Sequence, residues 1–381
     1  MSDSATTRAW LSLILAPGVG AARANALGQL LGSPARWPEA DDATLASAGL
    51  DMAAIAGLRR PDPLALKRCL DWLSSPEHHL ITRDDPCYPP LLKRIDDPPP
   101  ALFVVGQTEA LVRPQVGIVG SRKATPGGLQ SASDFAAALA RRGFAVTSGL
   151  AAGADGAAHR GCLDAGGVTI GVCGTGPDQV YPARHRELAR EMMNRGALVS
   201  ALPPGTGPRP ANFPARNRII SGMSLGVIVV EAGIRSGSLI TARLAGEQGR
   251  EVFAVPGSVH NPLARGCHRL IRDGAQLVES IDEVIDSLAP IAAELAEQIE
   301  QLIGLGAAPG VEPERQATYK EQDPEYARLL AAVGFDPTPV DEIIQRSRLT
   351  TAAVSSMLLM LELDGLVASH PGGRYSRTGK E

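Results

Sequence analysis

Between residues 116 and 255 the chain repeats one pattern, a short apolar run followed by a longer stretch with the spacing of a helix. The apolar runs are continuous rather than alternating, which is typical of strands buried on both faces of a parallel sheet. The runs are Val116–Ser121, Ala145–Ser148, Thr169–Cys173, Leu198–Ala201, Leu225–Glu231 and Glu251–Val255. Helices are expected at Leu129–Arg142, Asp155–Ala165, Arg184–Arg195, Arg216–Gly222 and Ser238–Gly249. The pattern predicts an α/β domain with an extended, Rossmann-type, doubly wound and mostly parallel sheet.

The flanking segments lack this alternation. Near the N-terminus, the helical runs Leu11–Leu15 and Ala21–Leu31 are separated by the turn Pro17-Gly18-Val19-Gly20. This is the outline of a helix-hairpin-helix, whose turn amides can hold a DNA phosphate, and it equally fits a helix turn in a packing module. At the other end, three helical runs precede two short strands joined by Gly372-Gly373, which describes a winged helix. The three runs are Glu325–Val333, Pro339–Ser347 and Thr351–Asp364.

These patterns divide the chain into four expected parts. A small helical domain, similar to the SAM and helix-hairpin-helix folds, covers residues 1–80, and the Rossmann-type domain covers 81–289. A linker at 290–324, with one amphipathic helical stretch and then a run rich in Gly and Pro, leads to the winged-helix domain at 325–381. Asp84–Pro100 is rich in Pro and Asp and is expected to be an irregular connection.

Composition limits the functions that fit. With 44% hydrophobic and 20% charged residues, the chain can form packed cores. Its net charge of −4 excludes a uniformly basic nucleic-acid binder but allows a local basic groove. The five cysteines are scattered without C-x-x-C spacing, which favours a reducing cytoplasm over a disulfide framework or a zinc site. No apolar run reaches the ~18 residues of a membrane span, so we expect no membrane partner.

The strand ends carry the candidate chemistry, because ligands of an open parallel sheet bind at the carboxyl ends of its strands. Loops of Gly, Ser and Thr follow five of the predicted strands, and their backbone amides suit phosphate oxygens. The loops contain Gly120-Ser121-Arg122-Lys123, the run Ser148-Gly149 to Gly153, Gly174-Thr175-Gly176, Ser236-Gly237-Ser238 and Pro256-Gly257. Five such loops at one edge predict a site for a polyanion or a nucleotide.

Charge is segregated toward the same edge. Residues 110–133 contain no Asp or Glu and carry Arg113, Arg122 and Lys123. Residues 192–230 are also free of acids and carry four arginines, Arg195, Arg209, Arg216 and Arg218. Both windows include carboxyl ends of strands, so the sequence predicts a basic groove of the kind that tracks a single-stranded backbone without sequence preference. Phe213 lies in the second window and is a candidate for stacking on a base.

Familiar nucleotide-binding and catalytic motifs are missing from the sequence. There is no G-x-x-x-x-G-K-[ST] phosphate loop, and no G-x-G-x-x-G follows the first strand. The residues Asp155, His159, Asp178, His185 and Glu231 form no recognisable nucleophile–base or metal-ligand spacing. Asp155 and His159 lie four residues apart on a predicted helix, so we expect a pair that caps and orients the preceding Gly loop. We therefore predict a protein that is not an enzyme and that has no cofactor and no metal.

A series of ordered motifs resembles the bacterial DNA-processing protein family, called DprA or Smf. They cover residues 80–289 and include Gly120-Ser121-Arg122, the run from Ser148 to Asp155 with His159, and Tyr181-Pro182. They continue with Phe213 to Gly222, Glu231-Ala232, Ser236 to Ala242 and Val255-Pro256-Gly257. The resemblance implies binding of incoming single-stranded DNA in natural transformation, protection of that DNA, and loading of the recombinase RecA. It also implies an extended Rossmann fold that forms a homodimer.

The resemblance implies site residues as well. The arginine of the G-S-R motif is a DNA contact in the family, and here it is Arg122. Many members have a lysine directly after Tyr-Pro, where this chain has Ala183 followed by Arg184. An arginine one position further along leaves open whether the second contact is replaced. His185 stands near a position where Asn is common in the family.

The expected DNA contacts combine cations, amides and one aromatic ring. They are Gly120, Ser121, Arg122, Lys123, Ser148, Gly149, Gly174, Thr175, Gly176, Arg184, Phe213, Arg216, Asn217, Arg218, Ser236, Gly237 and Ser238. The presumed recognition helix of the winged domain, TTAAVSSMLLMLE, has no Lys or Arg, and residues 325–381 hold six basic against seven acidic residues. Reading a duplex needs positive charge, so we expect protein contact or a regulatory role there. Leu358, Leu359 and Leu361 are expected in its core.

Two other functions fit the sequence less well than DNA binding does. The Gly-rich edge also resembles nucleoside-monophosphate phosphoribohydrolases with P-G-G-x-G-T-x-x-E, but here Glu231 precedes Ser236-Gly237-Ser238 instead of following it. A transcription regulator would read duplex DNA with its winged helix, which the neutral helix disfavours.

Overall fold

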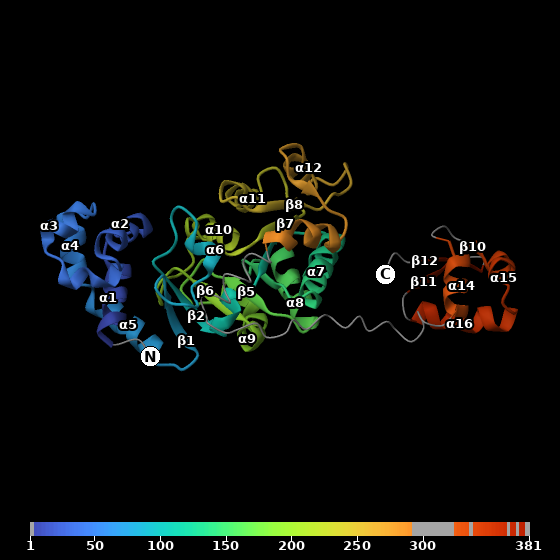
Figure 1. Ribbon diagram of the computed structural model, residues 1–381, viewed down its shortest axis with the longest axis horizontal. Coiled ribbons are helices and arrows are strands. Elements are labelled where there is room, and N and C mark those ends of the chain that lie inside the picture. The colour runs from blue at the N-terminus through green and yellow to red at the C-terminus, as the bar shows by residue number, and fades with distance from the viewer. Residues whose placement is uncertain (1–3, 292–323, 335–337, 364–365, 371–372, 378–381) are drawn as a thin grey trace. The chain divides into compact units, whose positions relative to one another are not determined.

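The computed structural model describes residues 4–291, 324–334, 338–363, 366–370 and 373–377. The chain divides into two compact units, Met1–Ala308 and Pro309–Glu381. In the first unit a twisted sheet carries helices on both faces (Figure 1). The linker expected at 290–324 lies almost entirely outside the described residues.

The sheet has nine strands in the order β1-β2-β6-β5-β4-β3-β7-β8-β9. Their bounds are β1 His78–Thr82, β2 Ala101–Gly106, β3 Gln115–Gly120, β4 Ala145–Ser148, β5 Thr169–Val172, β6 Ala197–Ser200, β7 Gly226–Val230, β8 Glu251–Ala254 and β9 Gln276–Leu277. The pairs from β6 through β9 are parallel, which confirms the predicted sheet. The chain runs outward from β3 to β6 and then returns to β7 on the other side of β3, so the strand order reverses at β3 and β7. The carboxyl ends of β3 and β7 therefore flank the crevice where such sheets bind ligands.

Helices fill both faces. Their bounds are α6 Pro90–Lys93, η2 Thr108–Val112, α7 Pro126–Arg141, α8 Ala154–Asp164, η3 Ala183–His185, α9 Arg186–Arg195, α10 Asn212–Met223, α11 Ser238–Glu247 and α12 Arg265–Arg272. Of the five predicted helices, α7, α8 and α11 agree to within three residues at each end. The helix expected at Arg184–Arg195 begins as the short 3-10 turn η3, and α10 starts four residues before the expected Arg216.

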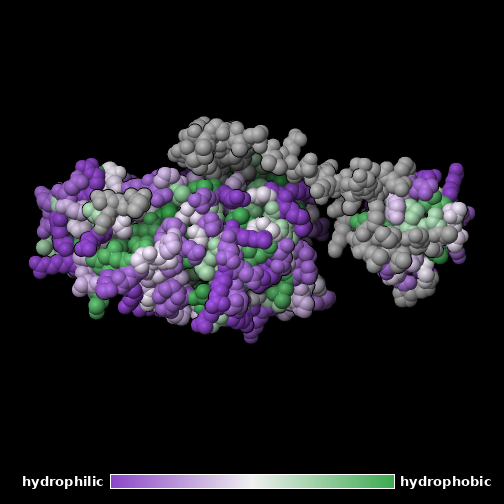
Figure 2. All heavy atoms as spheres, turned by 90° about the horizontal axis from the view of Figure 1, so that it is seen from below, coloured by the Kyte–Doolittle hydropathy of each residue, from purple (hydrophilic) through white to green (hydrophobic). Residues whose placement is uncertain are grey.

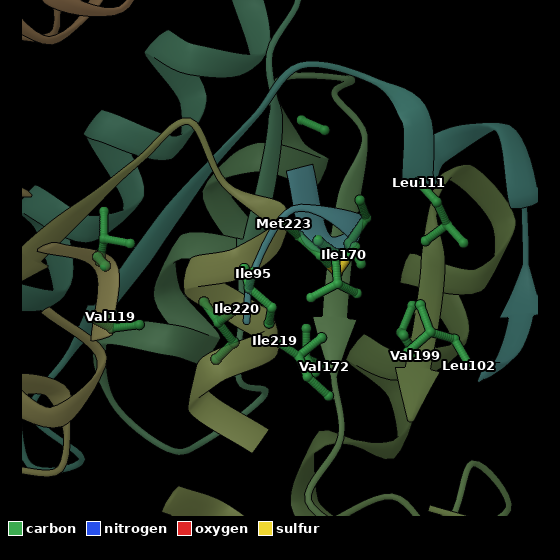
Figure 3. Packing of buried hydrophobic residues seen from close by; sticks show 14 of the residues in the cluster. Ile95, Leu102, Leu111, Val119, Ile170, Val172, Val199, Ile219, Ile220 and Met223 are labelled. Atoms are coloured by element: carbon green, nitrogen blue, oxygen red, sulfur yellow. The ribbon is translucent and has the colours of Figure 1, made fainter. Parts of the chain in front are cut away.

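Side chains of alternate strand residues separate two cores. Val227 and Val229 of β7 join the core under α10 and α11, whereas Ile228 and Val230 join the core under α7. This burial on both faces explains why the strands read as continuous apolar runs. In Figure 3, Ile219, Ile220 and Met223 of α10 lie beside Ile170 and Val172 of the sheet, and Val199 lies next to Leu102. This packing fixes the rotation of α10 and decides where its polar residues point.

The sequence analysis did not predict the antiparallel edge of the sheet. β2 pairs antiparallel with β6, and β1 pairs antiparallel with β2. β2 is fully apolar and buried, but it follows the Pro-rich segment and precedes the first strand of the regular alternation. Within that segment, Tyr88 is buried and its hydroxyl donates to the carbonyl of Pro99 (2.7 Å). The expected irregular connection therefore includes one short helix, α6, and an anchored aromatic side chain.

The N-terminal helices form a core of their own. α1 (Ser4–Leu15) and α2 (Ala21–Leu31) flank the predicted Gly-Val-Gly turn, where the carbonyl of Gly18 accepts from Arg23 Nη1 (2.7 Å). Further helices are η1 Pro34–Glu39, α3 Asp42–Ser47, α4 Met52–Arg59 and α5 Pro63–Leu73. Asp41 and Asp51 cap α3 and α4 by accepting from backbone amides at 2.8 Å, as short polar residues do at helix starts. The face of the molecule in Figure 2 is largely hydrophilic, with smaller hydrophobic areas between.

The second unit has the predicted winged-helix elements. They are α14 Pro324–Ala332, β10 Thr338–Pro339, α15 Val340–Ser347, α16 Thr351–Leu363, β11 Val367–His370 and β12 Arg374–Arg377. β12 pairs with both β11 and β10, and the short strand β10 was not foreseen. Leu358 and Leu361 are buried in the core, as predicted, and the side chain of Leu359 lies outside the described residues.

Candidate nucleic-acid interface

A cavity of about 810 Å³ opens at the carboxyl edge where β3 and β7 meet, and we call it the switch-point cavity. The loop after β3 supplies Gly120, Ser121, Arg122 and Lys123 to its wall, and the loop after β7 supplies Gly233 and residues 235–238. Helix α10 adds Phe213 and Asn217. Gly120 is required for this closure, because a Cβ atom there would lie 2.0 Å from the carbonyl oxygen of Val230.

The exposed charges at this cavity are cationic. Arg122, Lys123 and Arg235 are solvent-exposed and line the cavity. Among the described lining residues Asp155 is the single acid, and it is buried. In the described part of the chain no ion pair involves Arg122, Lys123 or Arg235. Three cations are thus left for an anionic ligand, on a protein that is acidic overall.

Arg216 does not have the exposed position that the sequence analysis expected. It is buried, and its Nη1 atom donates to the carbonyls of Gly149 (2.5 Å) and Val172. Its buried partner Asp155 accepts from the amides of Gly149 (3.2 Å) and Ala151 (3.3 Å). Burial raises the pKa of Asp155 and lowers that of Arg216, and the attraction between the two charges opposes both shifts. This pair holds the Gly149 loop in place, and Arg216 lines the cavity only from this buried position, so support of the loop is the role that its contacts show.

Arg218 also lies away from the position that was expected for it in the predicted basic groove. Its guanidinium donates to the carbonyl of Asp97 and lies 3.9 Å from the Asp97 carboxylate. Residues two apart on a helix face different directions, so Arg216 and Arg218 cannot serve one surface. Asn217, between them, does line the cavity, and its Nδ2 donates to the carbonyl of Gly237 (3.3 Å).

Two of the five Gly-rich loops have their polar groups occupied within the protein. Ser148 is buried and its hydroxyl donates to the carbonyl of Ile118 (2.5 Å), while the amide of Gly149 is used by Asp155. In the next loop, Thr175 is buried and donates to the carbonyl of Gln179 (2.5 Å), and the amide of Gly176 donates to Thr206 (2.8 Å). Gly174 lies under the ring of Phe213. The hydroxyls of Ser148 and Thr175 and the amides of Gly149 and Gly176 therefore already have partners within the protein, and contact of these two loops with DNA stays a prediction.

The loop after β7 places polar residues at the cavity, although the amide of Ser236 donates to the carbonyl of Gly233 (2.9 Å) and the amide of Ser238 donates to Ser236 Oγ (3.4 Å). It ends at the start of α11, where no side chain caps the helix and Ser236, Gly237 and Ser238 line the wall. The hydroxyl oxygens of Ser236 and Ser238 lie 2.6 Å apart. The start of α11 directs the positive end of its helix dipole at the cavity. This arrangement suits a phosphate oxygen.

Glu231 explains why the neighbouring helix start offers no such site. Its carboxylate accepts from the amide of Thr125 (2.7 Å), the Thr125 hydroxyl (2.7 Å) and Asn261 Nδ2 (2.9 Å). A carboxylate of the protein thus sits at the N-terminus of α7, the helix after β3 that binds the pyrophosphate in dinucleotide-binding sheets. Glu231 has φ of 52°, a left-handed conformation that is uncommon for residues other than glycine.

His159 does not pair with Asp155, contrary to expectation. Its Nδ1 contacts Thr169 Oγ1 (2.7 Å), whose own proton goes to the carbonyl of Val146 (2.9 Å), so Nδ1–H donates. Burial lowers the pKa of His159 to about 3, and neighbouring His185 and Arg216 add to the shift. The imidazole is neutral and structural, while the part of the prediction in which Asp155 orients the Gly loop is confirmed.

The turn after Tyr181-Pro182 is exposed. Arg184 lies in η3, is solvent-exposed and does not line the switch-point cavity. His185 turns inward, where its Nδ1 donates to the carbonyl of Leu150 (2.9 Å). Its ring also limits Gly156, where a Cβ atom would lie 2.8 Å from His185 Cε1. His185 therefore supports the Gly loop rather than facing a ligand.

Two lining residues were missed in the sequence analysis. Arg235 lies four residues after Glu231, and that acid ended the acid-free window at residue 230, before Arg235. The structure turns Glu231 toward Thr125 and leaves Arg235 at the cavity. Tyr181 appeared only as part of a motif, although its ring is 51% exposed and lies beside Phe213. No signal in the sequence connects it with a helix that begins 31 residues later.

The fold and the cavity define a Rossmann-type α/β protein with exposed cations at the carboxyl edge of its sheet. Two family models match the chain: DNA recombination-mediator protein A at residues 79–289 and the DprA winged helix domain at residues 313–373. Protein Smf of Escherichia coli is 44% identical over 312 residues, covering 81% of this chain and 80% of that protein. The chain belongs to the DNA recombination-mediator protein A family, whose members are named DprA or Smf.

Solved structures support the assignment. The structure of DNA processing protein A from Streptococcus pneumoniae aligns with a TM-score of 0.65 at 34% identity and covers 75% of this chain and 98% of that one. The protein from Helicobacter pylori, whose structure is described for its single-stranded DNA binding mode, aligns with a TM-score of 0.51 at 29% identity. That match covers 56% of this chain and 96% of that one.

The described residues contain no group of three or more His, Cys, Asp or Glu side chains that could hold a metal ion. None of the described helices is long and apolar enough to cross a membrane.

Proposed function

We propose that this protein binds single-stranded DNA without sequence preference in the switch-point cavity. The observation that carries the proposal is the set of three exposed cations, Arg122, Lys123 and Arg235, around one cavity whose only described acid is buried. The DNA-binding mode described for the Helicobacter pylori relative supports it.

In this proposal the cations contact phosphates, and the start of α11 adds its dipole and the neutral polar residues Ser236, Gly237 and Ser238. Gly120, Ser121 and Asn217 shape the wall between them. Cations and amides recognise the backbone and carry no information about the base, which accounts for binding without sequence preference. Phe213 faces the same cavity, with the guanidinium of Arg122 5.6 Å from its ring centroid, and offers a stacking surface that any base can use.

Arg184 is a further proposed phosphate contact on a DNA strand that leaves the cavity past η3. Its exposure supports this role, and its distance from the cavity wall makes the role secondary to that of Arg122.

We propose binding rather than catalysis at this site. The carboxylates of Asp155 and Glu231 accept from backbone amides, and His159 is neutral and buried. A general acid or base must reach the proton that it moves, and these groups are held by the protein instead. Release of base from AMP by the purified protein would contradict this part of the proposal.

The titration of a labelled oligo-dT with the full chain at several salt concentrations tests the function. We expect binding in the nanomolar to micromolar range that weakens steeply with salt, because bound cations release counterions from the DNA. Equal affinity for dT and mixed-sequence oligonucleotides is expected. Failure of the wild type to bind at low salt would overturn the proposal.

Family membership extends the proposal to protection of incoming DNA in natural transformation, to loading of RecA and to a homodimer. The winged-helix unit is a candidate protein-contact or regulatory module, because α16 carries no Lys or Arg. RecA loading is tested by the rate at which RecA coats a labelled oligo-dT with and without the protein. An unchanged rate would exclude it, and sedimentation of the protein alone tests the dimer.

A further inference from the structure

One wall of the switch-point cavity carries two neighbouring aromatic rings from distant parts of the chain. The ring centroids of Tyr181 and Phe213 are 5.5 Å apart, and their planes are inclined by 49°. Tyr181 is 51% exposed, so burial against the protein does not account for its position. Both rings line the cavity beside Arg122.

The position of the Phe213 ring is fixed by the protein around it. A Cβ atom at Gly174 would lie 2.8 Å from Phe213 Cδ1, so the ring rests directly on the backbone of that loop. α10 begins at Asn212 and its apolar face is packed on the sheet, which fixes the place of Phe213. Tyr181 precedes η3, where His185 is anchored to the carbonyl of Leu150. The two rings therefore come from segments that are each fixed to the sheet edge.

We propose that Tyr181 is a base-contacting residue, and that its ring and that of Phe213 form a stacking surface for unpaired bases. The inference rests on the proposed function and deepens it by naming what recognises single strands. Cations contact the phosphates of single strands and duplexes alike, but only a single strand exposes the faces of its bases. The aromatic wall thus supplies the preference for single strands, and Arg122 supplies charge at the same place.

The test compares three proteins on two probes of equal length. The probes are labelled oligo-dT and an oligonucleotide of abasic deoxyribose phosphates, and the proteins are wild type, Tyr181→Ala and Tyr181→Phe. We expect Tyr181→Ala to weaken oligo-dT binding about 5- to 150-fold and to leave the abasic probe within about twofold of wild type. Tyr181→Phe keeps the ring and should match wild type on both probes.

The salt dependence adds an independent readout. Tyr181→Ala should leave the slope of log affinity against log salt unchanged, because no charge is removed. Its preference for oligo-dT over a duplex of the same length should fall by the same factor as its affinity for oligo-dT. Urea unfolding of the variants checks that a change in binding is not a change in folding.

Each result has one meaning. Equal weakening on both probes, or no weakening on either, would overturn the stacking role and leave the phosphate-binding function in place. Loss of binding in Tyr181→Phe would assign the effect to the hydroxyl and also overturn stacking. Failure of the wild type to bind oligo-dT would instead remove the proposed function itself.

Discussion

The loops after β3 and β7 resemble the loops after β4 and β5 in composition, yet the protein uses them differently. All four are rich in Gly, Ser and Thr, and all end at the same edge of the sheet. After β4 and β5, the hydroxyls of Ser148 and Thr175 and the amides of Gly149 and Gly176 donate to acceptors within the protein. After β3 and β7, Arg122, Lys123 and Arg235 reach an open cavity.

The strand order is the cause of this difference. From β3 to β6 the chain adds each new strand on the same side of the sheet, so β4 and β5 lie between consecutive strands. Helices α8, α9 and α10 cover the loops that follow β4 and β5. β3 and β7 lie where the direction reverses, and the connections diverge and leave a crevice. Arg216 and Arg122 show the same contrast for one residue type. Arg216 lies under the closed loops and supports them, whereas Arg122 lies at the crevice and is free to bind.

The largest effect is expected when the buried support is removed. Arg216→Met should lower the free energy of unfolding by about 3–5 kcal/mol, because Asp155 would be left buried without a counter-charge. Urea unfolding measures this change. Arg218→Met on the same helix is the matched control, and it should cost less than about 1 kcal/mol since that side chain is 27% exposed. Similar losses of stability in both variants would contradict the supporting role of the buried Arg216.

Lowering the pH should reduce the free energy of unfolding through protonation of His159. Its pKa is lowered to about 3 in the folded protein, so the unfolded chain binds the proton first as pH falls below about 6.5. The contribution to stability is complete above that pH and is lost at up to about 1.4 kcal/mol per pH unit toward pH 3. Asp155 acts with the opposite sign, because its raised pKa favours proton uptake by the folded state.

His159→Asn isolates the histidine from Asp155. Asn keeps a donor near the position of Nδ1 and has no ionisation, so the difference in slope between wild type and variant between pH 6 and pH 4 belongs to His159. Chemical unfolding over that range measures it. Equal slopes would show that the imidazole is not buried in neutral form.

At the open crevice, Arg122→Ala should weaken oligo-dT binding about 10- to 100-fold, because the variant loses one charge-assisted contact to a phosphate. The salt slope should become shallower by about one unit. Arg141→Ala is the matched control, because Arg141 is exposed at the other end of α7. An Arg122→Ala variant with a wild-type slope would mean that this side chain does not contact a phosphate.

The smallest effect concerns Glu231, which occupies the start of α7. Glu231→Gln should reduce stability by about 1 kcal/mol, because a neutral amide accepts more weakly and no longer interacts with the helix dipole. Oligo-dT affinity should stay within about twofold of wild type, measured in the same titration. A large loss of affinity would place Glu231 in the binding site. It would contradict the distinction between the start of α7, which Glu231 occupies, and the start of α11, which faces the cavity.

Much of the fold could be predicted from the sequence, because a strand buried on both faces leaves a continuous apolar run. All six predicted strands form, and β4 has the predicted bounds. The edge strands β1 and β2 were missed since they lie outside the regular alternation. Among the site residues, Arg122 and Lys123 could be found from the strand end that they follow. Arg216 and Arg218 were misplaced because charge density along the chain does not show which side of a helix a residue occupies.

The sequence by itself determined the layered α/β class, the Gly-rich edge and the family, because these depend on local spacing and on ordered motifs. The tertiary structure decided which cations are free, which loops are closed, and that Tyr181 lies beside Phe213. These features depend on the rotation of α10, on the reversal of strand order and on contacts between distant segments. A residue's neighbours along the chain do not contain that information, since burial and hydrogen-bond partners arise only when the elements pack.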